Sequence, residues 1–392
     1  MAEQGSKDLV VKKAFSFETV IFLALLSLIL GSLSHKMGAI NMVNTMLNTA
    51  YGLLMDTVFY IMAIAVIAGA LSSLFTEFGV VAVINRILSP LMKPLYGLPG
   101  AAIVGVITTY LSDNPAILSL ADDSNFRRYF KKYQLPAINN LGTSFGMGLI
   151  VTAFVMGIKN DTGENFVLAA LIGNIGAIIG SVVSVRLMLL KTKKIFGTEE
   201  SVETIDSDSN SPMTLNERIV RNGNPAERCL DSILEGGKSG VKVGMSIIPG
   251  VLIICTLVMM FTNGASASGV YTGAAYEGIG LLPKLAEKIE FILVPLFGFS
   301  SSEAIAVPIT ALGSAGASIG LIPELVKNHL AYGNDVAVFT AMCMCWSGYL
   351  STHVAMMDSL NYRELTGHAI LSHTIGGICA GASAHYLYMF LL

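Results

Sequence analysis

A carboxylate lies at the end of an uncharged apolar stretch of this chain. Residues 101–111 carry no charge, and Ser112, Asp113, Asn114 and Pro115 follow them directly. An ionisable side chain far from water is costly and usually marks function. Asp113, with Ser112 and Asn114, can therefore bind hydroxyl or amine groups of a solute, or a cation. The alternative is that Asp113 only caps the short helix that follows, because Asp and Asn before Pro are favoured there.

A second polar break lies about 200 residues further along. Residues 304–312 are uncharged and lead to Gly313, Ser314 and Ser318, which offer backbone groups and small hydroxyls. Ser347 and His353 then interrupt a later apolar run. The predicted substrate-binding residues are Ser112, Asp113, Asn114, Gly313, Ser314, Ser318, Ser347 and His353.

A polar band suited to a sodium ion occurs between the two breaks. Asn139, Asn140, Thr143 and Ser144 share one apolar run, and hydroxyls with carbonyl oxygens are the ligands that a hard cation prefers. We predict these four residues as the ion-coupling set. The alternative is that they only hydrogen-bond one helix to another.

Three further residues are weaker candidates. His373 can relay protons or be a structural histidine, and Asn174 lies on a neighbouring apolar run. Glu303 follows a serine by three residues at the start of an uncharged segment, a pattern typical of a capping box. Cys343 and Cys345 could share a metal only if their helix unwinds, because side chains two apart point away from each other. We expect no cofactor apart from the sodium ion.

The composition indicates a membrane protein. Of 392 residues, 53% are hydrophobic and 13% charged, whereas about a quarter of a soluble domain is charged. Apolar runs of about 20 residues can cross a bilayer. Seven such runs lie near 17–34, 51–76, 134–158, 165–190, 240–262, 335–357 and 366–391. The first run could instead be a signal peptide, because Lys12 and Lys13 precede it and small residues end it.

The Lys and Arg residues predict the orientation. With the N-terminus cytoplasmic and the C-terminus outside, 19 of them lie inside and 5 outside, as expected for a multi-pass protein of the cell membrane. Each half then has three crossings, so the second half is inverted relative to the first. The predicted parts are an N-terminal helix and loop (1–50), a first repeat (51–194), a cytoplasmic linker (195–238) and a second, inverted repeat (239–392).

Two short stretches support the duplication. Residues 94–98 read PLYGL and residues 295–299 read PLFGF, 201 positions later. In each half an amphipathic helix lies before the turn, and an uncharged arm after it reaches toward the middle of the bilayer. The fold class is therefore all-α, with seven transmembrane helices and two re-entrant hairpins in an inverted repeat. Interrupted segments at matching positions are the best pointer to a transporter's binding site.

This arrangement resembles the Gate, or nucleoside-recognition, membrane family, which is related in architecture to concentrative nucleoside transporters. The resemblance covers residues 51–392, and its similar residues are concentrated at 112–116 (SDNPA) and 139–148. In the nucleoside carriers a Gln-Thr-Glu-type motif at the first tip reads the solute, and Ser112, Asp113 and Asn114 stand in that place here. The resemblance implies transport of a small polar solute, most of all a nucleoside, coupled to sodium or protons.

Two other functions stay open at the level of the sequence. One is a non-transporting scaffold or regulator whose linker recruits a cytoplasmic protein, and the other is a metal-ion permease. No nucleotide-binding or hydrolase motif occurs, so we expect no enzyme. The expected partners are a small-molecule substrate and the lipid bilayer, and no nucleic acid is expected. The sequence leaves open whether the chain forms a homo-oligomer.

Overall fold

The computed structural model describes residues 13–112, 117, 124–127, 129–159, 163–202, 220–266 and 268–392. The chain is 76% helical, and the described residues contain no β-strand. The predicted all-α fold is confirmed. Asp113 and Asn114, and residues 203–219 of the predicted linker, lie outside the described residues.

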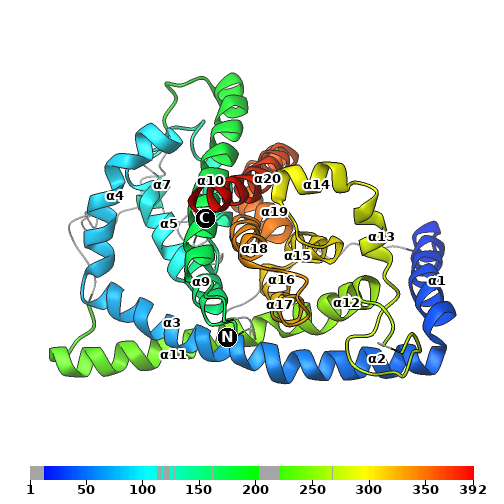
Figure 1. Ribbon diagram of the computed structural model, residues 1–392. Helices are drawn as coiled ribbons and strands as arrows, with labels where there is room; N and C mark the ends of the chain where they lie inside the picture. Colours follow the sequence, from blue (N-terminus) through cyan, green and yellow to red (C-terminus); the bar gives the residue numbers. More distant parts are fainter. Residues whose placement is uncertain are drawn as a thin grey trace.

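Two very long helical runs form the base of the molecule (Figure 1). The first has 39 residues and the second 38, which at 1.5 Å per residue is about 58 Å, against about 30 Å for a bilayer core. Each run must therefore tilt strongly or extend beyond the lipid. Their parts are α2 (Ala39–Gly52), the π-helix η1 (Leu53–Val58), α3 (Phe59–Glu77), α11 (Pro225–Pro249), the π-helix η2 (Gly250–Cys255) and α12 (Thr256–Thr262).

Small residues allow α3 and α11 to touch at the backbone. A Cβ atom added to Gly240 would lie 2.2 Å from the carbonyl oxygen of Ala65, and one added to Gly236 would lie 2.2 Å from that of Gly69. Gly236, Gly240 and Gly244 recur every fourth residue, which is the spacing that brings membrane helices into close contact. We call the two runs together the long helix pair.

The other helices of the first half rise from this pair. An upright helix, α1 (Phe17–Met37), precedes the pair and turns into it at Gly38. The remainder are α4 (Val80–Tyr96), α5 (Ala102–Leu111), α7 (Ser124–Arg127), α8 (Ala137–Thr143), α9 (Gly148–Met156) and α10 (Val167–Phe196). The predicted amphipathic helix is α4, and it continues through Pro94 before turning at Gly97.

The second half follows a similar order. Its helices are α13 (Leu281–Glu287), α14 (Glu290–Phe297), the 3₁₀-helix η3 (Ser302–Ile305), α15 (Ala306–Ala311), α16 (Ala315–Ile319), α17 (Ile322–Lys327), α18 (Gly333–Cys345), α19 (Tyr349–Ser359), the 3₁₀-helix η4 (Arg363–Leu365) and α20 (Thr366–Leu391). In Figure 1, α18, α19 and α20 lie with α10 in the middle of the molecule.

The same backbone turns recur at one fixed distance along the chain. Gly79 and Gly280 have φ values of 81° and 60°, and Gly97 and Gly298 have 72° and 62°. Met147 (φ 58°) and Gly348 (φ 65°) form a third such pair. All three pairs are 201 residues apart. Left-handed turns at matching positions support a duplication, while the domain boundaries and the inversion across a membrane stay predictions.

The third and sixth predicted crossings are not continuous helices. The third crossing breaks between α8 and α9 at residues 144–147, and the sixth breaks between α18 and α19 at residues 346–348. Both second segments begin after a residue with positive φ, Met147 or Gly348. Broken helices leave backbone groups free of helical hydrogen bonds, which transporters use to bind solutes and ions.

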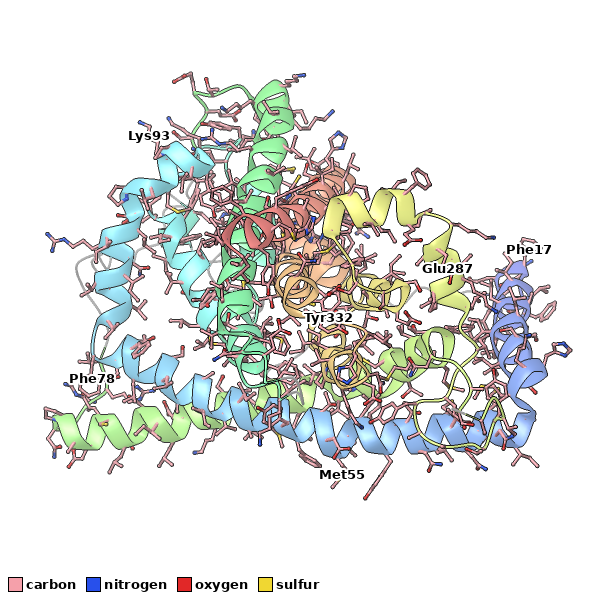
Figure 2. The ribbon with its side chains drawn as sticks, in the orientation of Figure 1. Phe17, Met55, Phe78, Lys93, Glu287 and Tyr332 are labelled. Atoms are coloured by element: carbon pink, nitrogen blue, oxygen red, sulfur yellow. The ribbon has the colours of Figure 1, made fainter. Side chains whose placement is uncertain are left out.

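Several helices are long and apolar enough to cross a bilayer. By length and composition the described residues contain five, or six if the bent pair Glu290–Phe297 and Ser302–Ala311, which meet at 81°, is one span. The count of seven crossings and the re-entrant hairpins stay predictions. Met55 projects away from the long helix pair in Figure 2, and with Leu47 and Tyr51 it gives this face the exposed apolar side chains expected against lipid.

A buried carboxylate fastens the loop after α12. Glu277 accepts hydrogen bonds from the backbone N–H and hydroxyl of Thr272 and from the N–H of Gly273, at 2.7 to 3.0 Å. Burial would raise the pKa of Glu277, but these hydrogen bonds outweigh it and hold the pKa below its ordinary value. The carboxylate is therefore ionised at neutral pH and stabilises the loop.

Candidate transport site along the long helix pair

A first cavity lies beside the π-helix η1. Its volume is about 450 Å³, and we call it the Asp56 cavity. It carries charge of both signs from Asp56, Glu324, Lys159 and Lys327. Its lining residues are Leu53, Asp56, Thr57, Tyr60, Phe154, Gly157, Ile158, Lys159, Met259, Tyr276, Gly320, Pro323, Glu324 and Lys327.

A second cavity lies further along the same helix pair. Its volume is about 280 Å³, and we call it the Ser112 cavity. Arg221 and Glu235 line it as an ion pair, with Nη2 and Oε2 2.5 Å apart. Its lining residues are Ala65, Gly69, Ser72, Ser73, Leu111, Ser112, Ile150, Arg221, Glu235, Gly236, Ser239, Gly240 and Val243.

Packed apolar residues separate the two cavities. On the α2–α3 run the Asp56 cavity ends at Tyr60 and the Ser112 cavity begins at Ala65. Ile61 lies between the cavities on this run, and Ile247 and Val251 lie between them on the second run. These three residues are buried in one core cluster with Met147 and Ala317, and none of the five lines either cavity. We call Ile61, Met147, Ile247, Val251 and Ala317 the barrier residues. The two cavities thus lie on one seam, between the long helix pair and the rest of the molecule, with a closed segment between them.

The second hairpin tip forms part of this barrier. Ser314 caps α16 by accepting a hydrogen bond from the N–H of Ala317 at 3.2 Å, and a Cβ added to Gly250 would lie 3.5 Å from the Ser314 Cβ. Cys255 Sγ donates to the Ala317 carbonyl oxygen at 2.9 Å. Gly313 lies at the turn before Ser314. The tip therefore rests on the π-helix η2.

Ser318 fastens this hairpin from inside. Its hydroxyl donates to the carbonyl oxygen of Val307 at 2.6 Å, which joins the two arms, and lies 3.1 Å from Cys343 Sγ on α18. Cys343 and Ser318 are both buried. This serine joins the two arms of the hairpin, and its hydroxyl is already hydrogen-bonded within the protein.

The first hairpin contributes Ser112 and Tyr110 to the described structure. Ser112 ends α5 and lines the Ser112 cavity, while Asp113 and Asn114 lie outside the described residues. Tyr110 Oη donates to Asn174 Oδ1 at 3.0 Å and lies 3.3 Å from Thr152 Oγ1. Asn174 is thereby part of a satisfied polar cluster. Among the described residues, neither cavity is lined by side chains from both tips, and the predicted substrate-binding set stays a prediction.

The predicted ion-coupling residues are all fully buried; three lie on α8 and Ser144 caps its C-terminus. Thr143 and Ser144 donate their hydroxyl hydrogens to carbonyl oxygens of the preceding turn, and Asn140 Nδ2 donates to Ser184 Oγ at 2.9 Å. Asn139 keeps both side-chain amide atoms unpaired, and Asn140 keeps Oδ1 unpaired. Two free amide oxygens suit a sodium ion, which stays a prediction.

His353 and His373 come together from α19 and α20. Their ring centroids are 4.7 Å apart, and neither side chain is exposed. Ser184 Oγ lies 2.9 Å from His373 Nδ1, so this pair is connected to Asn140. Ser347 is buried in the break between α18 and α19.

Glu303 does not share a cavity with the second hairpin tip. It lines a separate cavity of about 470 Å³ with Glu287 and Glu290. The predicted capping box with Ser300 is wrong, because the Ser300 hydroxyl donates to the buried carboxylate of Asp335 at 2.6 Å and η3 begins after Ser301. The Ser300 hydroxyl that a capping box with Glu303 would require is therefore bonded to Asp335 instead.

Sequence reasoning missed the charged lining of both cavities. Asp56 is the lone charged residue between Lys36 and Glu77, which is the signal that could have identified it. Its place in a π-helix is a second sign of function, because such turns are frequent at functional sites. Arg221 and Glu235 could not be assigned, because their pairing depends on how the linker folds back.

Comparisons with known proteins identify the fold. An outward-facing variant of CNTnw, a concentrative nucleoside transporter, has 13% sequence identity over 95% of this chain and 84% of its own, with a TM-score of 0.52. CNTnw in an inward-facing, substrate-bound state has 11% identity over 94% of this chain and 84% of its own, with a TM-score of 0.53. The fold resembles that of concentrative nucleoside transporters.

The apolar helices and the fold shared with these transporters indicate a multi-pass membrane protein. The structures that the fold resembles are transporters and not enzymes. No protein-family model matches the chain, and no curated protein sequence is similar to it. Membership of the Gate family therefore stays a prediction, as do the orientation of the termini and the oligomeric state.

Proposed function

We propose that this chain is a secondary active transporter of a small polar solute, with nucleosides as the first candidates. The observation that carries the proposal is the seam: two cavities at different positions along one helix pair, with the barrier residues and the second hairpin tip between them. Alternating access requires such a barrier to open on each side in turn. The fold shared with CNTnw supports nucleosides as the class to test first.

The two cavities have separate roles in this proposal. With the N-terminus cytoplasmic, the Ser112 cavity opens toward the cytoplasm and the Asp56 cavity toward the outside. Ser112, Asp113 and Asn114 contact the solute from the first hairpin, and backbone groups near Ser314 contact it from the second. The unpaired oxygens of Asn139 and Asn140 are the sites for a coupling sodium ion.

Uptake by proteoliposomes tests the function. Purified protein should take up at least one radiolabelled purine or pyrimidine nucleoside against a gradient when sodium or a pH gradient is imposed. Asp113→Ala should lower that uptake at least about tenfold, because a charged hydrogen-bond partner contributes about 1.5–3 kcal/mol. Asp358→Asn is the matched control, because Asp358 pairs with Arg363 at the surface. Absence of driven uptake for every nucleoside would refute the nucleoside proposal.

A further inference from the structure

His353 and His373 form a fully buried pair that the transport site does not use. Their rings face each other at 4.7 Å between centroids, and each Nε2 atom is buried without a hydrogen-bond partner. Neither imidazole lines the Asp56 cavity or the Ser112 cavity. An unpaired buried polar atom costs about 1–3 kcal/mol, so two of them side by side call for a function or a ligand.

The hydrogen bonds at Nδ1 determine what each Nε2 offers. His353 Nδ1 bonds to the Tyr349 carbonyl oxygen, which can only accept, so the neutral His353 has a lone pair at Nε2. Ser184 Oγ accepts from Asn140 and can donate its own hydrogen to His373 Nδ1. The neutral His373 then carries N–H at Nε2. The pair therefore presents one free acceptor beside one free donor.

The other half of the chain shows that packing alone does not require histidines here. Thr152 lies 201 residues before His353, and Asn174 lies 199 residues before His373. Asn174 Nδ2 donates to Thr152 Oγ1 at 2.8 Å, and Tyr110 completes this cluster. The equivalent positions are thus filled by Thr152 and Asn174, which do not titrate and which hydrogen-bond to each other. Only the second half places two titratable, unsatisfied rings there.

In the part of the chain that the structure describes, no ion pair joins a charged side chain to either histidine. Tyr349 stacks on His373 at 6.0 Å between ring centroids. The acids and bases on α18, α19 and α20 have other surroundings: Asp335 accepts from Ser300, Asp358 pairs with Arg363, His385 bonds to Asn334 and His368 is exposed. Arg186, two residues beyond Ser184 on α10, donates instead to the carbonyl oxygens of Pro94 and Leu95.

A metal ion does not fit the pair. The part of the chain that the structure describes contains no group of three His, Cys, Asp or Glu residues arranged to hold one. A proton needs no cavity and no third ligand. Imidazole is the side chain that binds one near physiological pH.

We propose that His353 and His373 together bind one proton, taken from water at the free Nε2 of His353, and that binding it shifts the protein away from the arrangement described here. The cation formed would be buried without a partner, which is unfavourable. Protonation therefore favours any arrangement in which the break between α18 and α19 opens to water. This inference does not depend on the identity of the solute.

The single tryptophan of the chain can report on this proton. Trp346 lies in the same break, and its Nε1 donates to the His373 carbonyl oxygen at 3.2 Å. A protonated imidazole nearby quenches indole emission, and opening of the break changes it further. We expect the emission of purified wild-type protein in nanodiscs to change in one transition as the pH is lowered from neutral, at lower pH than an exposed imidazole would titrate, because burial disfavours the charged ring.

The experiment compares the wild type with three variants. The transition should disappear in His353→Gln and in His373→Gln. It should persist in His368→Gln, which changes an exposed histidine on α20. Gel filtration verifies that each variant is folded. Flat wild-type emission, or a transition that survives in both folded variants, would overturn the inference. Because no solute is added, this result is independent of whether nucleoside uptake is found.

Discussion

A disulfide between the second hairpin tip and the long helix pair is expected to abolish solute uptake. A Cβ at residue 250 lies 3.5 Å from the Ser314 Cβ and 3.8 Å from the Ala317 Cβ, and disulfides join Cβ atoms about 3.5–4.5 Å apart. Gly250→Cys with Ser314→Cys should therefore crosslink on oxidation. Proteoliposome uptake should fall to the level of empty vesicles and return on reduction, because the barrier can open only if the tip moves.

Single-cysteine variants are the controls for the crosslink. Cys255 lies against Ala317 and should be replaced by Ala in every protein, so that it cannot compete for the new thiols. Gly250→Cys with Ala317→Cys gives a second crosslink of the same tip. Full uptake by protein shown to be crosslinked would mean that the tip is not the moving barrier.

Gly240→Ala is expected to give the largest loss of stability among small substitutions in the long helix pair. The added methyl group would meet the Ala65 carbonyl oxygen at 2.2 Å, and backbone cannot move aside as a flexible side chain can. Overpacking of this kind costs about 1–3 kcal/mol or more. We expect a clearly lower midpoint of thermal unfolding in detergent and partial aggregation.

Gly237→Ala is the matched control three residues away. Its added methyl group would make ordinary contact with Val66 Cγ1 at 3.5 Å, while Ala gains about 1 kcal/mol over Gly in helix propensity. Its midpoint should equal or exceed that of the wild type. Equal midpoints for the two variants would show that α3 and α11 do not touch as described.

Composition and apolar runs were sufficient to predict the all-helical membrane fold. The turn at Gly97 and its counterpart at Gly298 were also predictable, because the two short stretches around them are alike. The breaks at Met147 and Trp346 were not predictable. Hydropathy averages over a run and does not detect one residue of unusual φ, and Met147 takes φ 58° although it is not glycine.

The candidate site was predictable only in part. Ser112 and Ser314 do lie at segment ends, because uncharged arms followed by polar residues mark such ends. The apposition of Ser314 and Gly250 depends on how two distant helices pack, which a single sequence does not specify. The lone Asp56 was a detectable signal, whereas the His353 and His373 contact required the crossing of α19 and α20.

Two-sided thiol labelling tests the seam most directly. Tyr60→Cys reports on the Asp56 cavity and Ser112→Cys on the Ser112 cavity, each made with the partly exposed Cys229 and Cys379 replaced by Ser. We predict that a membrane-impermeant reagent reaches residue 60 only from outside and residue 112 only from the cytoplasm, and that a transported nucleoside raises one labelling rate while lowering the other. Labelling of both residues from the same side, or rates that do not respond to a transported solute, would contradict alternating access along this seam.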